Sequence, residues 1–396
     1  MAQRNVQFPE RFAWGTSTSA YQIEGGGTNT DWWRYERAEG THCVEPCGDA
    51  CDSWNRYDED LDLIVDLGLN SFRLSVEWAR IEPERGVISR EALEHYRAVL
   101  DACHARSILP VVTLHHFTLP LWVADLGGFE SPEIASLMGN YARVVGEALG
   151  DLFGIACTVN EPNIVAMMGY LIGAFPPAQS SLERFVEVNQ ALRACHVAMR
   201  DALRATPGDY PIGLTLSMHE YEALAGGEDL LNSMRHEMED QYLRGVVDDD
   251  YLGVQCYTKF VIGPEGLIVT PDGELTAMGY LFWPQSVEYT LRRAASFVDI
   301  PLIMTENGIG TDDDEQRVRY LTGALQGLSN VISDGIDVRG YFQWSLLDNF
   351  EWTLGYRPKF GIVAVDRTTF ARTPKPSARW FANAVAGLEE RFNEKG

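Results

Sequence analysis

The chain has 396 residues, of which 45% are hydrophobic, and its formal net charge is −25. The length suffices for two average domains or one large barrel, and the composition allows a large buried core. The acidic balance argues against nucleic acid and anionic membrane surfaces as partners, because both attract patches of Lys and Arg. No apolar run is long enough to predict a membrane span, and residues 1–10 contain no apolar signal core, so we expect a cytoplasmic protein.

Short β-rich segments alternate with amphipathic helical patterns along the whole chain. The expected strands are Phe12–Ser17, Ser71–Ser75, Leu109–His115, Ile155–Asn160, Pro211–Ser217, Tyr251–Tyr257, Pro301–Thr305 and Gly340–Trp344. Apolar residues recur at three- and four-residue spacing in Arg56–Leu67, Arg90–Ala105, Ile134–Leu149, Ser181–Ala205, Pro284–Ser296 and Glu315–Ser333. Eight strand–helix units without a linker predict an α/β fold, a single-domain (β/α)8 TIM barrel over residues 1–396.

Neither a dinucleotide nor a metal is expected as a cofactor. The glycines at 25–27 lack the Gly-x-Gly-x-x-Gly spacing and lie several residues past the first strand. Cys43, Cys47 and Cys51 follow one another at four-residue spacing, which differs from that of zinc sites. Free thiols are the default in a reducing compartment, and a Cys43–Cys47 disulfide is the alternative.

Two matching segments each place a glutamate at the end of a short apolar run. Residues 158–162 read Thr-Val-Asn-Glu-Pro and residues 304–308 read Met-Thr-Glu-Asn-Gly, so the glutamates are Glu161 and Glu306. A carboxylate at the end of a buried strand is costly to desolvate, and two in matching contexts suggest a pair that meets in space. Such a pair suits acid/base and nucleophilic chemistry, and glycosidic bond cleavage in particular.

Further polar and aromatic residues fall at the strand ends, where a TIM barrel carries its active site. Hydrogen-bonding side chains next to tryptophan faces suit a sugar, whose hydroxyls need partners and whose C–H face stacks on rings. The candidates, in chain order, are Gln22, Glu24, Arg73, His115, His116, Asn160, His219, Glu220, Tyr257, Asn307, Trp344, Glu351 and Trp352.

Each candidate also has a purely structural interpretation. Residues 160–162 fit a helix cap, and residues 306–308 fit a turn after a strand. Adjacent His115 and His116 point to opposite faces of a strand, so a binuclear metal site is not expected and one of the two is structural. Arg73 also fits a counter-ion in the barrel interior. The remaining tryptophans that we interpret as packing residues are Trp14, Trp32, Trp33, Trp54 and Trp78.

Nearly end to end, the chain resembles glycoside hydrolase family 1, the β-glucosidase family. The resemblance is carried by motifs that include Ser19-Ala20-Tyr21-Gln22-x-Glu24-Gly25, Phe72-Arg73-x-Ser75, Thr158-x-Asn160-Glu161-Pro162, Thr305-Glu306-Asn307-Gly308 and the tail from Gly340 through Trp352 to Phe360-Gly361. It implies a retaining β-glycosidase, and within this class a β-glucosidase, that removes the non-reducing terminal β-D-glycosyl residue from small glycosides and oligosaccharides by double displacement.

The resemblance also implies roles for individual residues. Glu306 would be the nucleophile and Glu161 the general acid/base, with Arg73 and Tyr257 holding the carboxylate of Glu306. In this scheme the charge of Glu306 raises the pKa of Glu161 and keeps it an acid. Retention requires the two carboxyl groups to lie roughly 5–5.5 Å apart. The expected sugar-binding residues are Gln22, His116, Asn160, Trp344, Glu351, Trp352 and Phe360.

Some features depart from the family pattern or stay open. Phe117 stands where many relatives have Trp, and residues 219–250 form a shorter connection than is usual, so the leaving-group side is expected to be open. The carboxylate of Glu351 would repel a sugar 6-phosphate. The alternatives are a transglycosidase on the same site, a preference for galactose or fucose, a metal-dependent hydrolase, and a sugar-binding protein without activity. A homo-oligomer is possible.

Overall fold

Eight parallel strands form a closed barrel in the computed structural model, which describes residues 8–9, 11–268 and 272–393. Around the barrel, the strands follow the order β1 (Ala13–Ser17), β11 (Val338–Trp344), β10 (Leu302–Asn307), β7 (Tyr251–Cys256), β5 (Ile212–Ser217), β4 (Ile155–Asn160), β3 (Leu109–His115) and β2 (Ser71–Ser75). The predicted (β/α)8 architecture is therefore confirmed. The predicted domain over residues 1–396 includes residues 1–7, 10, 269–271 and 394–396, which lie outside the described part of the chain.

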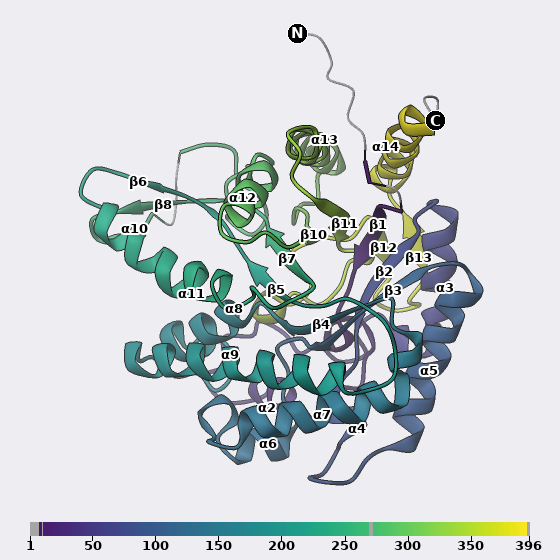
Figure 1. Ribbon diagram of the computed structural model, residues 1–396, viewed down its shortest axis with the longest axis vertical. Coiled ribbons are helices and arrows are strands. Elements are labelled where there is room, and N and C mark those ends of the chain that lie inside the picture. Colours follow the sequence, from purple (N-terminus) through teal and green to yellow (C-terminus); the bar gives the residue numbers. More distant parts are fainter. Residues whose placement is uncertain (1–7, 10, 269–271, 394–396) are drawn as a thin grey trace.

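Helices pack around the barrel and cover its strands (Figure 1). The long ones are α3 (Ser53–Asp66), α5 (Arg90–Ala105), α7 (Ile134–Leu149), α9 (Leu182–Arg204), α12 (Ser286–Ala295), α13 (Asp314–Ser333) and α14 (Pro376–Asn393). The first begins at Ser53 rather than at the expected Arg56, and Arg56 has non-helical dihedrals that mark a kink inside the helix. Burial of the strands on both faces, typical of parallel sheets, explains their nearly continuous apolar sequences.

The strand register sets the height of several candidate side chains in the barrel. Ser17 at the end of β1 pairs with Trp344 on β11 and with Arg73 on β2, so these two residues lie at the same level. Strand β10 extends two residues beyond the predicted end at Thr305, so it includes Glu306, which pairs with Gln255 on β7. The nucleophile candidate is thus held by a strand and not by a loop.

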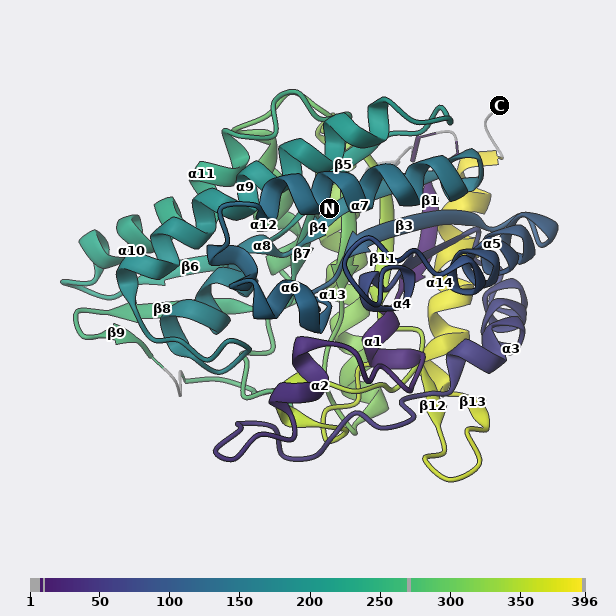
Figure 2. The same ribbon diagram turned by 90° about the horizontal axis from the view of Figure 1, so that it is seen from below.

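Short elements follow several barrel strands. They are α1 (Ala20–Ile23), α2 (Asp31–Tyr35), α4 (Trp78–Ile81), α6 (Leu121–Asp125), α8 (Pro162–Ala166), the π-helical turns η3 (Met167–Ile172) and η4 (His236–Asp240), α10 (Glu228–Arg235) and α11 (Gln241–Leu243). A small sheet of β6 (Glu220–Ala223), β8 (Lys259–Gly263) and β9 (Gly266–Leu267) lies with α10 at one edge of the molecule, opposite α3 and α14 (Figures 1 and 2). The hairpin β12 (Val363–Val365) and β13 (Arg372–Pro374) follows β11.

The cysteine loop carries no disulfide. Cys43, Cys47 and Cys51 are free thiols, so the alternative of a Cys43–Cys47 bond is wrong. The Cys47 thiol instead donates to the carbonyl of Tyr21 over 3.2 Å. Within the described residues, no group of His, Cys, Asp and Glu side chains is arranged to hold a metal ion, and no helix is both long and apolar enough to cross a membrane.

Candidate active site

The two glutamates lie at the carboxyl ends of β4 and β10, where the barrel opens. Glu161 follows β4 with a left-handed φ of +43°, and Pro162 begins α8 directly after it. Glu161 is the N-cap residue of α8, as the structural interpretation of residues 160–162 predicts, but its side chain makes no capping hydrogen bond. A left-handed conformation at a residue other than glycine is strained, and such strain is concentrated at functional sites.

Both oxygens of Glu306 are occupied by donors from the protein. Arg73 donates from Nη1 to Oε1, and the hydroxyl of Tyr257 donates to Oε2 over 2.6 Å. Arg73 is fully buried on β2, where Nη2 donates to Asn160 Oδ1 over 2.6 Å and Nε donates to Thr113 Oγ1 over 3.1 Å. The guanidinium is therefore fixed by three neighbouring strands, and it holds the carboxylate of Glu306 in one orientation.

The surroundings of Glu161 and Glu306 differ in hydrogen-bond donors more than in burial. Burial raises the pKa of Glu306, and the charge of Arg73 and the hydrogen bond from Tyr257 oppose this effect. Burial is also the largest cause that raises the pKa of Glu161, to about 8, and the charge of Glu306 comes second. The expectation that the charge of Glu306 raises the pKa of Glu161 is confirmed, and burial adds a larger contribution in the same direction. A pKa of about 8 makes Glu161 a proton donor at neutral pH.

A cavity of about 370 Å³ opens at the mouth of the barrel in front of these glutamates. Most of the predicted sugar-binding side chains line it together with the two carboxyl groups. These lining residues are His116, Glu161, Tyr257, Glu306, Trp344, Glu351, Trp352 and Phe360. Three of the predicted residues are fully buried and do not line the cavity: Gln22, Arg73 and Asn160. They therefore support the side chains that line it.

His116 presents a free ring nitrogen beside the tryptophan faces. The amide nitrogen of Asn160 lies 3.2 Å from His116 Nε2, so Nε2 accepts and the proton of the neutral ring is on Nδ1, which has no partner. Burial lowers the pKa of His116 well below its ordinary value, which keeps the ring neutral. The ring is stacked at 5.9 Å from Trp344 and 6.2 Å from Trp352. His116 can therefore donate to a hydroxyl of a sugar that lies on these rings.

Two further carboxyl oxygens in the cavity have no hydrogen-bond partner: Oε1 of Glu161 and Oε2 of Glu351. Burial, and then the charge of Glu306, raises the pKa of Glu351 to about 8, so this group is largely protonated at neutral pH. Gln22 supports the loop before Glu351, because its amide donates to the carbonyl of Phe350 over 2.7 Å. Buried polar atoms without partners are rare in folded proteins and mark where a ligand's hydroxyls would bind.

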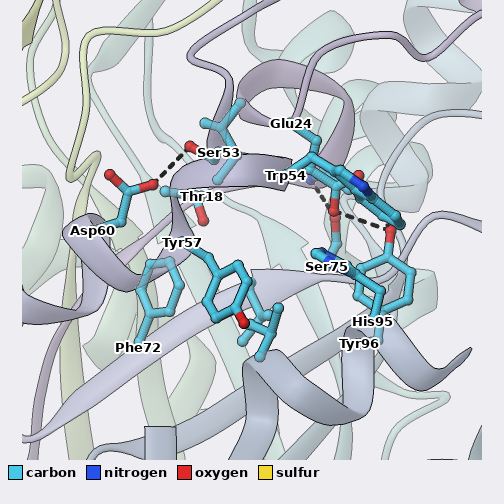
Figure 3. A pocket seen from close by; sticks show the side chains of 14 residues that line it. Thr18, Glu24, Ser53, Trp54, Tyr57, Asp60, Phe72, Ser75, His95 and Tyr96 are labelled. Atoms are coloured by element: carbon cyan, nitrogen blue, oxygen red, sulfur yellow. Dashed lines mark hydrogen bonds between the residues drawn. The ribbon is translucent and has the colours of Figure 1, made fainter. Parts of the chain in front are cut away.

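Several strand-end candidates do not reach this cavity. Glu24 forms an ion pair with Arg80 at 2.8 Å and accepts from the hydroxyl of Tyr96 at 3.0 Å, next to the stacked rings of Trp54 and His95 behind the barrel (Figure 3). A space of only about 30 Å³ adjoins this cluster, enough for about one water molecule. Glu24 is therefore assigned to the packing between the barrel and its helices.

The other excluded candidates also have structural partners. Glu220 accepts from the indole of Trp283 over 2.7 Å. Asn307 donates to the carbonyl of Cys256 over 2.7 Å, and the hydroxyl of Tyr341 donates to it over 2.8 Å. His115 packs edge-on against Phe129, and burial lowers its pKa to about 3. The prediction that one of the two adjacent histidines is structural holds, and it is His115.

Sequence reasoning missed much of the cavity wall. Five methionines from four parts of the chain line it: Met167 and Met168 of η3, Met234, Met238 and Met278. Phe117 and Phe175 also line it, and Phe117 has a left-handed φ of +72°. The adjacent pair Met167-Met168, six residues after Glu161, was the available signal. Methionines at helical spacing usually indicate an ordinary core, so the pattern alone did not reveal this wall.

Comparison with known proteins gives consistent matches over almost the whole chain. The family model described as glycosyl hydrolase family 1 matches residues 4–252 and 240–389. β-Glucosidase A of Thermotoga maritima is 32% identical over an alignment of 443 residues, gaps included, which covers 97% of this chain and 99% of the relative. Coniferin β-glucosidase of Pinus contorta is 32% identical, with 94% of this chain and 91% of the relative covered. Because the alignment with the first relative is longer than this chain, the chain lacks segments that this relative has.

Solved structures match the fold equally closely. A β-glycosidase from Pyrococcus horikoshii has a TM-score of 0.90 at 32% identity, with 98% of each chain covered. A β-glucosidase from Thermotoga maritima in complex with glucoimidazole also has a TM-score of 0.90, at 28% identity, with 96% of this chain and 99% of that chain covered.

Proposed function

The chain belongs to glycosyl hydrolase family 1, and we propose that Glu306 and Glu161 make it a retaining β-glucosidase acting on small, unphosphorylated β-glucosides. It is a glycoside hydrolase of the β-glucosidase type. One observation carries the residue assignment: of two buried carboxyl groups at the barrel mouth, Glu306 accepts from Arg73 and Tyr257, while Glu161 keeps an oxygen without a partner. One group is thus prepared as an anion and the other as an acid.

The reaction proceeds in two displacements at these side chains. The Glu306 carboxylate attacks the anomeric carbon while Glu161 protonates the departing glycosidic oxygen, which gives a covalent glycosyl ester on Glu306. Formation of the ester neutralises Glu306, which removes its charge from the surroundings of Glu161. The pKa of Glu161 then falls, so it takes a proton from water, and that water hydrolyses the ester. The product keeps the β configuration.

Sugar hydroxyls would satisfy the polar atoms that the free cavity leaves without partners. His116 Nδ1 donates to one hydroxyl, and the protonated carboxyl of Glu351 both donates and accepts. Trp344 provides the surface on which the pyranose ring stacks. Asn160 and Gln22 act indirectly, by orienting His116 and the loop that carries Glu351.

The preference for an unphosphorylated sugar has a different reason from the one predicted. Repulsion by an ionised Glu351 is weak at neutral pH, because the pKa of this group is raised to about 8. Among the described residues that line the cavity, however, none is Lys or Arg, so a phosphate would enter without a countercharge. We expect hydrolysis of a β-glucoside to exceed that of its 6-phosphate by at least about tenfold.

A direct test follows the first product by NMR during hydrolysis of an aryl β-glucoside. The β-anomer of the free sugar should appear first and then mutarotate, whereas an α-anomer would refute the retaining assignment. A panel of aryl β-glycosides that differ only in the sugar tests the glycone, and a higher kcat/KM on the galactoside or fucoside would contradict the choice of glucose. Cytoplasmic location and a homo-oligomeric state stay predictions.

A further inference from the structure

One wall of the active-site cavity is almost entirely apolar. It is built by the chain segment that follows β4, by the excursion between β5 and β7, and by β8, which follows β7. Ile164 and Met168 come from α8 and η3, Met234 from α10, Met238 from η4, and Phe260 from β8. Methionines provide flexible, polarisable surface, and sulfur–aromatic contacts are favourable. The wall is therefore suited to contact an aromatic ring.

This wall lies on the side of the leaving group. In the closed barrel, β4 and β11 are four strands apart in either direction, so Glu161 and Trp344 stand across the mouth from one another. The sugar lies on Trp344, and the acid Glu161 must reach the oxygen that joins the sugar to its leaving group. Because α8 begins at Pro162, directly after Glu161, the methionines that follow surround the group beyond that oxygen.

The wall offers little to the hydroxyls of a second sugar. Among the described lining residues, none is Asn, Gln, Asp, Lys or Arg, and the carboxyl groups of Glu306 and Glu351 belong to the sugar side. The other polar groups that line the cavity include the hydroxyls of Ser217, Tyr221, Tyr280 and Thr353 and the ring of His219. His219 packs at 4.6 Å against Phe260, and burial lowers its pKa to about 4, so it is uncharged. Its unpartnered Nδ1 can pair with one oxygen at most.

We propose that the leaving-group subsite of this chain selects an apolar alcohol that carries an aromatic ring, and that it discriminates against a second sugar unit. This inference rests on the proposed function. A pyranose on this wall would lose hydrogen bonds from several hydroxyls to water and regain few of them, whereas a phenyl ring loses only unfavourable hydration. Met168 and Met234 are the specificity-determining residues, since they present thioethers from opposite segments of the wall.

The test compares 2-phenylethyl β-glucoside with cellobiose. The alkoxide of 2-phenylethanol is no better as a leaving group than that of a sugar, so both substrates need the proton from Glu161 and reactivity does not favour the aromatic one. We expect kcat/KM for 2-phenylethyl β-glucoside to exceed that for cellobiose by about tenfold or more, the range expected for one well-filled apolar contact. Equal values, or a preference for cellobiose, would overturn the proposal.

Variants locate the preference on the wall. Met168→Gln and Met234→Gln keep the side-chain length and add an amide, and each should lower the ratio of the two kcat/KM values by about threefold to tenfold. Methyl β-glucoside has no group that reaches the wall, so its kcat/KM in each variant is the reference against which the other two values are compared. The control Leu182→Gln places the same amide at a side chain that is 66% exposed and outside the cavity, and it should leave the ratio unchanged.

The outcomes separate the two proposals. If methyl β-glucoside, cellobiose and 2-phenylethyl β-glucoside all resist the wild-type protein, the proposed function fails. If the glucosides are hydrolysed and the ratio stays the same in both methionine variants, the function stands and the specificity assignment fails. Thermal unfolding of each variant shows that it is folded before its ratio is compared.

Discussion

Replacing Tyr257 with Phe removes one hydroxyl next to Glu306 and leaves the aromatic ring in place. That hydroxyl donates to Glu306 Oε2 over 2.6 Å, while Arg73 serves the other oxygen. Burial already raises the pKa of Glu306, and Tyr257 is one of the groups that oppose this rise. The Tyr257→Phe variant should therefore keep its nucleophile protonated up to a higher pH than the wild type.

The size of this effect follows from the hydrogen bond that is lost. A hydrogen bond to a charged group contributes about 1.5–3 kcal/mol, and about 1.4 kcal/mol corresponds to one pH unit. The acidic limb of kcat/KM should move upward by about one to two pH units. The assay uses 2,4-dinitrophenyl β-glucoside, because its leaving group departs without a proton from Glu161 and the limb then reports the ionisation of Glu306.

Tyr280→Phe is the matched control, since Tyr280 lines the same cavity and makes no hydrogen bond to Glu306. Its acidic limb should coincide with that of the wild type. An acidic limb in Tyr257→Phe that stays within about 0.3 pH units of the wild type would refute the argument that this hydroxyl stabilises the ionised nucleophile. A shift of the same size in both variants would instead indicate a general change in the polarity of the cavity.

Three further predictions concern the carboxyl groups. Glu161→Ala should retain rapid glycosylation by 2,4-dinitrophenyl β-glucoside and lose at least about a hundredfold on an alkyl glucoside, whereas Glu306→Ala should lose turnover on both; equal losses would contradict the assigned roles. In the wild type, kcat/KM for an alkyl glucoside should fall above about pH 8, as Glu161 loses its proton, and the dinitrophenyl substrate should not show this limb. Burial raises the pKa of Glu24 and Asp31 to about 7 and of Glu351 to about 8. Because the folded state binds these protons more tightly than the unfolded state, their contribution to the free energy of unfolding is greatest below about pH 4.5 and is lost as the pH rises to about 8. Calorimetry should give a lower Tm at pH 8.5 than at pH 5.5, and Glu351→Gln should reduce the difference.

The barrel was predictable because its signals are local and repeated. Each barrel strand is a short apolar run that ends at polar or turn-forming residues, and each long helix has a clear apolar face. The order of these elements alone therefore determines the fold class. The missed elements are those whose pattern is weak. Strand β6 has the alternation Glu-Tyr-Glu-Ala, and it is held in a three-stranded sheet by β8, which lies 36 residues further along the chain. No local sequence signal predicts such a pairing.

The sequence predicts which strand ends carry the site, but it does not predict as well whether each side chain turns toward the cavity or away from it. Arg73, Tyr257 and Glu306 were expected to meet, and the structure places them in hydrogen-bond contact. Glu24 and Glu220 also follow barrel strands, yet each finds a partner outside the cavity. A residue in a loop after a strand can turn toward either side, and the choice depends on tertiary partners such as Arg80, which the sequence does not connect to Glu24.

The two glutamates differ in protonation because they have different hydrogen-bond donors, and not because one is more deeply buried than the other. Glu161 and Glu306 are 8% and 3% exposed, so desolvation acts on both in the same direction. What separates them is that β2 and the end of β7 supply Arg73 and Tyr257 to one carboxyl group and leave an oxygen of the other free. Glu161 lines the same cavity as the apolar wall on which we place the leaving group. Burial of this carboxyl group keeps it an acid, and the apolar wall selects the alcohol that it protonates.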